Sequence, residues 1–174
     1  MKKIILILVI GFLLVGCSSA SHETKNYTAE DLKEFMGKIY QDIIQVVPIH
    51  DTVIVDDEDD LHIILQYEVG ELKFREDIRH MVTSTAMLVT VPYQLSLIKI
   101  NHRADIEKIK NEIADYLCFQ MWGGISIADR VSVTNYGSVL IVLKSENLLG
   151  DIILQEIKKV TNDKIGKIEE RFND

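Results

Sequence analysis

RVSVTNYGSVLIVLKS, residues 130–145, is the stretch that decides the fold. RVSV and VLIVLKS are rich in valine, isoleucine and leucine, and the residues TNYGS between them form a turn sequence in which Asn135 or Gly137 can take a positive φ. Two β-type runs joined by such a turn predict an antiparallel hairpin.

Helical periodicity flanks this hairpin on both sides. One helix is predicted to open at Ala104 and to end at Gly123-Gly124. A last helix is predicted to run towards the C-terminus, with a continuation past Gly166 left open. The apolar stripes of the two helices are Ile106, Ile109, Ile113 and Leu117, and Ile152, Ile153, Ile157 and Val160.

The first half of the chain begins with the same order of elements. A helix is predicted to start at the N-cap Thr28 and to end before Pro48. The runs TVIV (52–55) and LHIILQYEV (61–69) then predict a second hairpin, closed by the acidic turn DDEDD (56–60).

A helix and a strand complete this half. The helix is predicted from Glu71 or Lys73 through Ile78, Met81 and Val82 to Thr85. MLVTV (87–91) fits either a helix or a strand. QLSLIKI (94–100), after the break at Pro92, is predicted to be a third strand.

The two halves suggest an internal duplication. Thr52–Gln66 aligns with Arg130–Lys144 without a gap, although any two helix–hairpin–helix units share this much apolar periodicity. The predicted fold class is α+β, with two consecutive helix–β-hairpin–helix units, residues 30–100 and 101–174, and helices packed on one face of an antiparallel-rich sheet. Because each unit alone buries little surface, the two are expected to share one core.

The start of the chain resembles a secretory leader. Lys2 and Lys3 precede IILILVIGFLLV (4–15), which is shorter than the roughly 20 apolar residues that span a bilayer as a helix. Leu14-Val15-Gly16-Cys17 resembles the lipobox of bacterial lipoproteins. An uncleaved anchor, or an ordinary signal peptide with a chance cysteine, is the alternative.

The lipobox resemblance implies a cellular location and a membrane anchor. Residues 1–16 would be a signal peptide, Cys17 would carry a diacylglyceryl group, and residues 17–29 would be the lipidated cysteine and a flexible tether. The expected location is the extracytoplasmic face of the cell membrane, or the outer membrane if the host is Gram-negative. The membrane is then a partner through Cys17.

Composition excludes some partners. Loss of Lys2 and Lys3 with the leader leaves 17 basic and 27 acidic residues, a net charge of −10 with histidines neutral. Nucleic acid binding needs clustered Lys and Arg, so no nucleic acid partner is expected. An anionic lipid surface would attract only a local basic cluster. The candidates are Arg75, Arg79 and His80, or Lys158, Lys159, Lys164 and Lys167.

No set of residues predicts catalysis, a metal or another cofactor. The chain has two cysteines, and because Cys17 would carry the lipid, Cys118 has no partner for an intramolecular disulfide. Cys118 is expected to be a small buried hydrophobic residue. Asp56–Asp60 is a weak calcium candidate, better explained as a solvated turn. The histidines lack metal-ligand spacing; they are His22, His50, His62, His80 and His102.

Two family resemblances point to a non-enzymatic envelope protein. Residues 1 to 115 resemble the sporulation lipoprotein family of spore-forming Firmicutes (the YhcN/YlaJ type). The resemblance rests on the lipobox and on the runs VIV (53–55), LHIILQY (61–67), DIRHMV (77–82), LSLIKI (95–100) and ADIEKIKNEI (104–113). It implies a role in sporulation or envelope maintenance, through an envelope protein partner or self-association. The order of elements is also similar to the BON domain, which implies contact with phospholipid.

Overall fold

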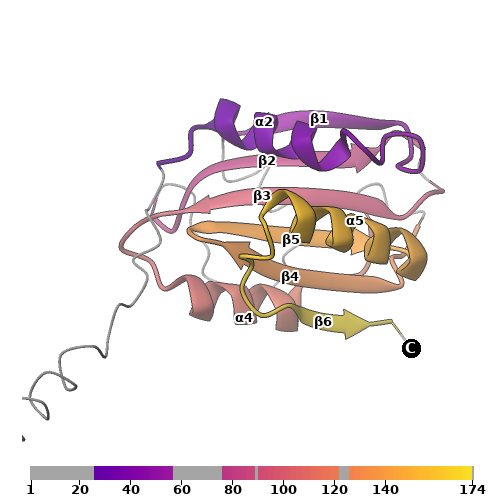
Figure 1. Cartoon of the computed structure of the whole chain (residues 1–174). Helices are drawn as coiled ribbons and strands as arrows, with labels where there is room; N and C mark the ends of the chain where they lie inside the picture. Colours follow the sequence, from indigo (N-terminus) through magenta and orange to yellow (C-terminus); the bar gives the residue numbers. More distant parts are fainter. Residues whose placement is uncertain (1–25, 57–75, 89, 122–125, 174) are drawn as a thin grey trace, which may run out of the picture.

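The computed structural model describes residues 26–56, 76–88, 90–121 and 126–173. A six-stranded sheet, in which every neighbouring pair is antiparallel, has the strand order β1-β2-β3-β5-β4-β6 (Figure 1). Its strands are β1 (His50–Val55), β2 (Ile78–Ala86), β3 (Tyr93–Ile100), β4 (Arg130–Tyr136), β5 (Val139–Ser145) and β6 (Glu169–Phe172). Its helices are α2 (Ala29–Tyr40), α4 (Ile106–Tyr116) and α5 (Asn147–Val160).

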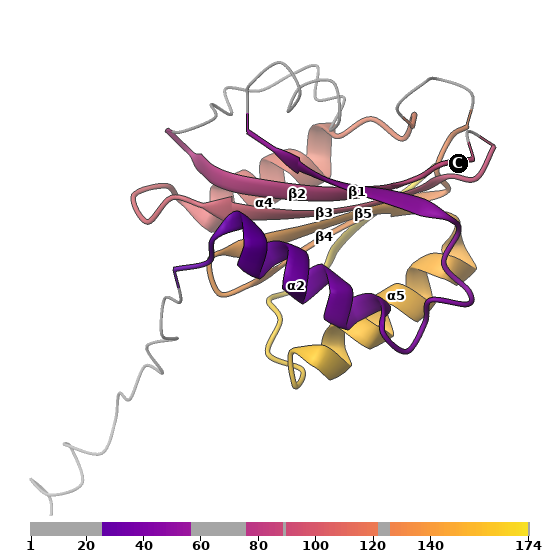
Figure 2. The same ribbon diagram turned by 90° about the horizontal axis from the view of Figure 1, so that it is seen from above.

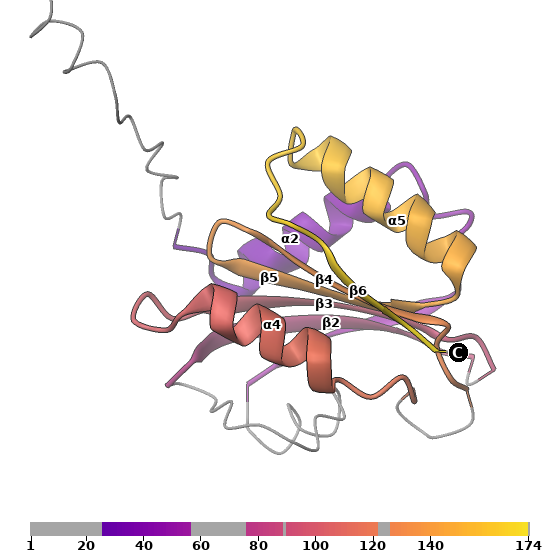
Figure 3. The same cartoon turned by 90° about the horizontal axis from the view of Figure 1, so that it is seen from below.

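Helices cover both faces of the sheet, whereas the sequence predicted helices on one face only. Helices α2 and α5 lie on one face and α4 on the other (Figures 2 and 3). The reason is visible in β5, where Ile141 and Leu143 pack into the core under α2 and α5 while Leu140 and Val142 pack into the core under α4. A strand that is apolar at nearly every position needs cover on both sides.

The helix predicted up to Thr85 is wrong over its described part, because Ile78–Ala86 forms β2. A β-bulge between Ile78 and His80 shifts the alternation of side chains. Ile78 and Met81 therefore share the α4 core, while Val82 faces the opposite core. Three buried residues at positions i, i+3 and i+4 imitate a helix.

The two-unit arrangement is not confirmed. Strand TVIV is confirmed within β1, but β1 pairs with β2, and the predicted partner strand 61–69 and the helix start at Glu71 or Lys73 lie outside the described residues. The proposed repeat matched Asp77–Arg79 with Glu156–Lys158, yet the first segment enters a strand and the second lies in a helix. The coarser prediction, an α+β fold with an antiparallel sheet, is confirmed.

The other elements follow the prediction with shifted ends. Thr28 caps α2, which ends at Tyr40 rather than near Pro48. The hairpin of β4 and β5 and the strand β3 are confirmed. The described residues of MLVTV (87–91), which leave out residue 89, belong to the connection between β2 and β3. Helix α4 starts after the N-cap Asp105 and ends before Leu117, whereas the predicted stop at 123–124 lies outside the described residues.

The last helix does not continue past Gly166. Helix α5 ends at Val160, and Asn162 and Asp163 take the left-handed conformation with φ of 52° and 58°. The chain then turns back, and β6 pairs with β4 at the edge of the sheet. This strand was not predicted because its sequence, EERF, is short and charged.

Arg130 joins three of these elements. Its guanidinium is buried, and its Nη1 lies 2.8 Å from Asp151 Oδ1 of α5 and 3.3 Å from Glu170 Oε1 of β6. Nη2 donates to the Asn147 carbonyl at 3.2 Å. Gly150, one helical turn along α5, lies directly over this guanidinium. The packing of α5 on the sheet therefore depends on the buried Arg130 guanidinium and on the absence of a side chain at Gly150.

Candidate functional site

The fold begins at a well-formed helix cap. Asp31 Oδ2 accepts from the Thr28 backbone N–H at 2.9 Å, and Thr28 Oγ1 accepts from the Asp31 N–H at 3.1 Å. This reciprocal capping box fixes where the segment that follows Cys17 becomes helix. Cys17 itself lies outside the described residues.

Helix α2 begins at the end of the sheet that we call the tethered end, because the tether predicted from the sequence would join the fold there. It is defined by the start of α2, the end of β3 at Ile100 and the turn at Gly137-Ser138, and it lies at the left of Figure 1. The ring of Phe35 packs 5.8 Å from that of Tyr136, which places the first turns of α2 beside the β4–β5 turn.

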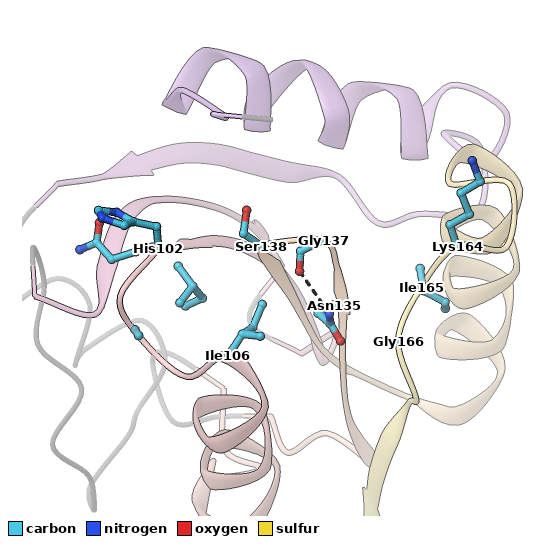
Figure 4. Close-up of a pocket in the computed structure, with 11 residues that line it drawn as sticks. His102, Ile106, Asn135, Gly137, Ser138, Lys164, Ile165 and Gly166 are labelled. Carbon is cyan, nitrogen blue, oxygen red and sulfur yellow. Dashed lines mark hydrogen bonds between the residues drawn. The ribbon is translucent and has the colours of Figure 1, made fainter. Parts of the chain in front are cut away.

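A pocket of about 490 Å³ opens at the tethered end (Figure 4). In this view His102 and Lys164 lie on opposite sides, with Ile106 and Ser138 between them. Both His102 and Lys164 are exposed. The lining residues are Ile100, Asn101, His102, Ala104, Ile106, Asn135, Gly137, Ser138, Lys164, Ile165 and Gly166.

The pocket wall is built by the tight β4–β5 turn. Gly137 has a φ of +57°, as the first central residue of a two-residue hairpin loop requires, so the predicted positive φ falls on Gly137 and not on Asn135. The Asn135 carbonyl accepts from the Gly166 N–H at 2.7 Å, and its side-chain amide donates to the Gly137 carbonyl at 3.2 Å. Lys99 donates to Ser138 Oγ.

The lining can hold a small group but offers little chemistry. Isoleucines and an alanine form much of the surface, and the cationic or titratable groups are Lys164 and His102. No carboxylate or cysteine is among the described lining residues, whose polar side chains are those of Asn101, His102, Asn135, Ser138 and Lys164. The arrangement fits a weakly polar or anionic ligand.

At the opposite end of the sheet, two phenols meet in the core under α2. The hydroxyl groups of Tyr40 and Tyr93 are hydrogen-bonded, and both side chains are buried. Burial raises the pKa of Tyr40 to about 12 and raises the pKa of Tyr93 well above its usual value. The His50 ring packs 4.4 Å from that of Tyr40. Both phenols therefore stay neutral and bind each other.

This pair allows a test by double-mutant cycle. Tyr93→Phe should lower the free energy of unfolding by about 1–2 kcal/mol, because the Tyr40 hydroxyl loses its hydrogen bond to the Tyr93 hydroxyl in a buried site. The double variant Tyr40→Phe/Tyr93→Phe should cost much less than the sum of the two single variants. Urea unfolding measures all three, and Tyr116→Phe, at an exposed position, should change stability by less than about 0.5 kcal/mol. Additive costs would contradict the pairing.

Exposed apolar side chains gather at this same end, which we call the apolar end. Six segments meet there. They are the connection before β1, the connection after β2, the C-terminus of α4, the residues before β4, the first turn of α5 and the end of β6. Its large exposed hydrophobic residues are Ile44, Val46, Ile49, Met87, Leu88, Tyr116, Ile127, Leu148 and Phe172. Exposed Val53 and Ile54 lie along β1, and none of the described residues of this kind lies at the tethered end. A cluster of exposed apolar side chains is typical of a surface that binds another molecule.

The structure separates the residues that the sequence singled out. His50, His80 and His102 lie on β1, on β2 and after β3, and among the described residues no group of His, Cys, Asp or Glu could hold a metal ion. His22, His62 and most of the acidic turn, Asp57–Asp60, lie outside the described residues. Cys118 follows the end of α4 and is partly exposed, not buried as expected.

The predicted basic clusters do not form as expected. Arg79 and His80 lie on β2 rather than on a helix, and Arg75 lies outside the described residues. Lys159 pairs with Asp42 and Glu156, and Lys167 pairs with Glu169. Lys158 and Lys164 are exposed, but they lie on α5 and on the segment after it.

Sequence reasoning missed the buried polar groups. Lys144 and Gln94 lie opposite each other in the α4-facing row, and Lys144 Nζ donates to the Gln120 carbonyl at 3.3 Å. The one available signal was the position of Lys144 itself, which falls on an inward-facing position of VLIVLKS. Tyr40 and Tyr93 gave no signal, since each fits an ordinary apolar position.

Comparison with known proteins adds no assignment, because no family model, curated protein or solved structure matches the chain. In the part of the chain that the structure describes, no helix is both long and apolar enough to cross a membrane.

Proposed function

We propose that this chain is a lipid-anchored cell-envelope protein without catalytic activity, which acts by binding a partner protein at its apolar end. The proposal rests on two features together: the lipobox at Cys17 and the exposed hydrophobic residues at the apolar end. The tether enters the fold at Thr28, at the end of the sheet away from the apolar end. Anchoring therefore leaves the exposed hydrophobic residues uncovered.

The length of the tether supports this arrangement. Ser18–Asn26 has nine residues. As a flexible coil it reaches about 15–18 Å on average. The tethered end therefore stays close to the lipid surface. A role in sporulation or envelope maintenance is part of the proposal and rests on the family resemblance of the sequence.

The anchor is tested by substituting the two cysteines separately. Cys17→Ser should abolish lipidation, so that the protein keeps its leader and its lipid mass is lost, whereas Cys118→Ser should behave as wild type. Mass spectrometry and membrane fractionation of protein from native-host cells give the readout. An unmodified thiol at position 17 of the wild-type protein would overturn the anchor.

The partner surface is tested in the same cells. A photo-crosslinking residue at position 148, at the apolar end, should give a discrete heavier product. The same residue at position 164, at the tethered end, should give little protein product. Leu148→Asp should lower partner recovery without lowering stability, because this side chain is 71% exposed. Equal crosslinking at both positions would contradict the assignment of the surface.

Phospholipid contact is the second candidate function. The pocket at the tethered end favours it, since this pocket combines an apolar lining with Lys164 and His102 near the point where the tether enters. Binding of the Ser18–Asp174 fragment to anionic vesicles, lost in Lys164→Glu and absent with neutral vesicles, would support this candidate. No flotation with either vesicle would exclude it.

A further inference from the structure

Lys99 is a buried cation beside the pocket at the tethered end. It is 6% exposed, and its ammonium donates to Oγ of Ser138, a residue of the pocket wall. Burial lowers the pKa of Lys99, and the nearby Arg79 guanidinium lowers it further. Both causes disfavour the charged form of this lysine. An anion close to the ammonium would therefore be bound favourably.

Ser138 connects this ammonium with the pocket. A serine hydroxyl accepts through its oxygen and has one proton to donate. Because the Lys99 ammonium donates to Ser138 Oγ, this oxygen acts as the acceptor, and the Ser138 proton can be donated to a ligand. Ser138 lies between His102 and Lys164 in the pocket (Figure 4). An anionic group at Ser138 would thus accept from a hydroxyl that a buried cation polarises.

Apolar side chains form much of the pocket surface. Ile100, Ala104, Ile106 and Ile165 line the pocket, and its described lining residues include no carboxylate that would repel an anion. The pocket volume, about 490 Å³, lies within the range of roughly 300–1,000 Å³ that is usual for small-molecule sites. A ligand that matches this lining therefore has a short apolar chain and an anionic end.

Hydrogen bonds hold the walls of the pocket in place. The Gly166 N–H donates to the Asn135 carbonyl at 2.7 Å, and Thr134 Oγ1 donates to the Gly166 carbonyl at 2.9 Å. On the other side, Asp105 Oδ1 accepts from two N–H groups in the first turn of α4, both at 3.1 Å. The isoleucines next to these bonds are therefore positioned before a ligand arrives, which lowers the entropic cost of binding.

We propose that the pocket at the tethered end binds a small organic anion with a single apolar chain. The anionic group accepts from Ser138, close to the Lys99 ammonium, and the chain lies against Ile106 and Ile165. A carboxylate and a phosphate monoester share this chemistry. The proposal goes beyond contact with a lipid surface, because one free molecule is bound. It requires neither the lipid anchor nor the partner protein.

Three soluble probes that share one alkyl chain test the head group. They are octanoate, octyl phosphate and 1-octanol. Full-length protein is held in nanodiscs of neutral lipid, and calorimetric titrations of empty nanodiscs correct for uptake of each probe by the lipid. At least one of the two anions should bind about tenfold more tightly than 1-octanol, because hydrogen bonds to a charged acceptor are stronger. The tighter anion identifies the head group, and equal affinities of all three probes would overturn the proposal.

Two substitutions test the position of the anionic group. Ser138→Ala removes the donor, and Lys99→Met removes the cation behind it. Each should weaken binding of the preferred anion about tenfold and leave 1-octanol binding unchanged. Lys158→Met, at an exposed position of α5 outside the pocket lining, is the control and should bind the anion as wild type does. Thermal unfolding establishes that each variant is folded. Wild-type affinity in both pocket variants would overturn the proposal.

The outcomes separate this site from the functions proposed above. A protein that binds neither anionic probe, yet floats with anionic vesicles until Lys164→Glu is introduced, would overturn the proposal and leave phospholipid contact standing. A protein that binds one anion at Ser138 but gives no crosslinked product from position 148 would support the proposal and count against the partner surface at the apolar end.

Discussion

Replacing Gly150 by alanine is expected to lower the free energy of unfolding by about 2 kcal/mol, although alanine is the better helix former. A Cβ at this position would overlap the Arg130 guanidinium and approach Ser145 Oγ to 2.6 Å. The guanidinium cannot move aside freely, because Asp151, Glu170 and the Asn147 carbonyl hold it. Steric overlap therefore outweighs the gain in helix propensity.

Gly37 provides the matched control for this substitution. It lies within α2, is exposed, and has no atom within 4 Å of the position that a Cβ would occupy. Gly37→Ala should raise stability by about 0.5–1 kcal/mol through helix propensity alone. Urea denaturation of both variants measures the contrast. If Gly150→Ala were as stable as Gly37→Ala, the described packing of α5 over Arg130 would be wrong.

Replacing Lys144 by methionine is expected to stabilise the fold at neutral pH by about 2–3 kcal/mol, because the buried ammonium is costly to desolvate. Lys144 is fully buried, and desolvation lowers its pKa from 10.5 to about 8, with Cys118 acting weakly in the opposite direction and Arg171 adding to the fall. Methionine keeps most of the aliphatic volume and carries no charge.

The stabilising effect of Lys144→Met is expected to depend on pH. Between pH 8 and 10.5 the folded state binds fewer protons at Lys144 than the unfolded state, so Lys144 makes the wild-type protein more stable as the pH rises through this window, by about 3 kcal/mol. The advantage of Lys144→Met should therefore shrink from pH 7 to pH 10. Tyr40 and Tyr93 act in the opposite sense above pH 10, which is why the difference between variant and wild type is the useful quantity.

An exposed lysine serves as the control. Lys158→Met, at an exposed position of α5, should change the free energy of unfolding by less than about 0.5 kcal/mol at neutral pH. Thermal unfolding in matched buffers measures all three proteins. A constant gap between Lys144→Met and wild type would contradict the assigned burial of the ammonium.

Locally determined elements were predictable from the sequence. The β4–β5 hairpin followed from two β-branched runs and Gly137, and the start of α2 followed from Thr28 with Asp31 three residues later. Both signals are short-range, since a two-residue turn and a capping box are each formed by a few neighbouring residues. The strand β3 was equally clear after Pro92.

Long-range features were not predictable. The bulge in β2 depends on pairing with β3, and it changes a strand pattern into one with helical spacing. The partner of β1 depends on which segment hydrogen-bonds to it, which periodicity does not encode. The position of α4 on the opposite face, and the burial of Lys144 beneath the segment at Gln120, also depend on tertiary packing.

The candidate site was predictable only at Cys17, and that part remains a prediction. The pocket at the tethered end combines residues from after β3, from the β4–β5 turn and from after α5, so no single stretch signals it. The apolar end likewise assembles from six separate connections and element ends. Exposure of an isolated leucine such as Leu148 cannot be inferred from its sequence context.

The contact between Arg130 and Glu170 has a consequence for local opening of the sheet. Glu170 reaches the guanidinium from the edge strand β6, whereas Asp151 and the Asn147 carbonyl reach it from α5. If β6 detaches from β4, Arg130 loses Glu170 but keeps its partners on α5. Detachment of this short edge strand is therefore a local fluctuation that leaves α5 docked on the sheet.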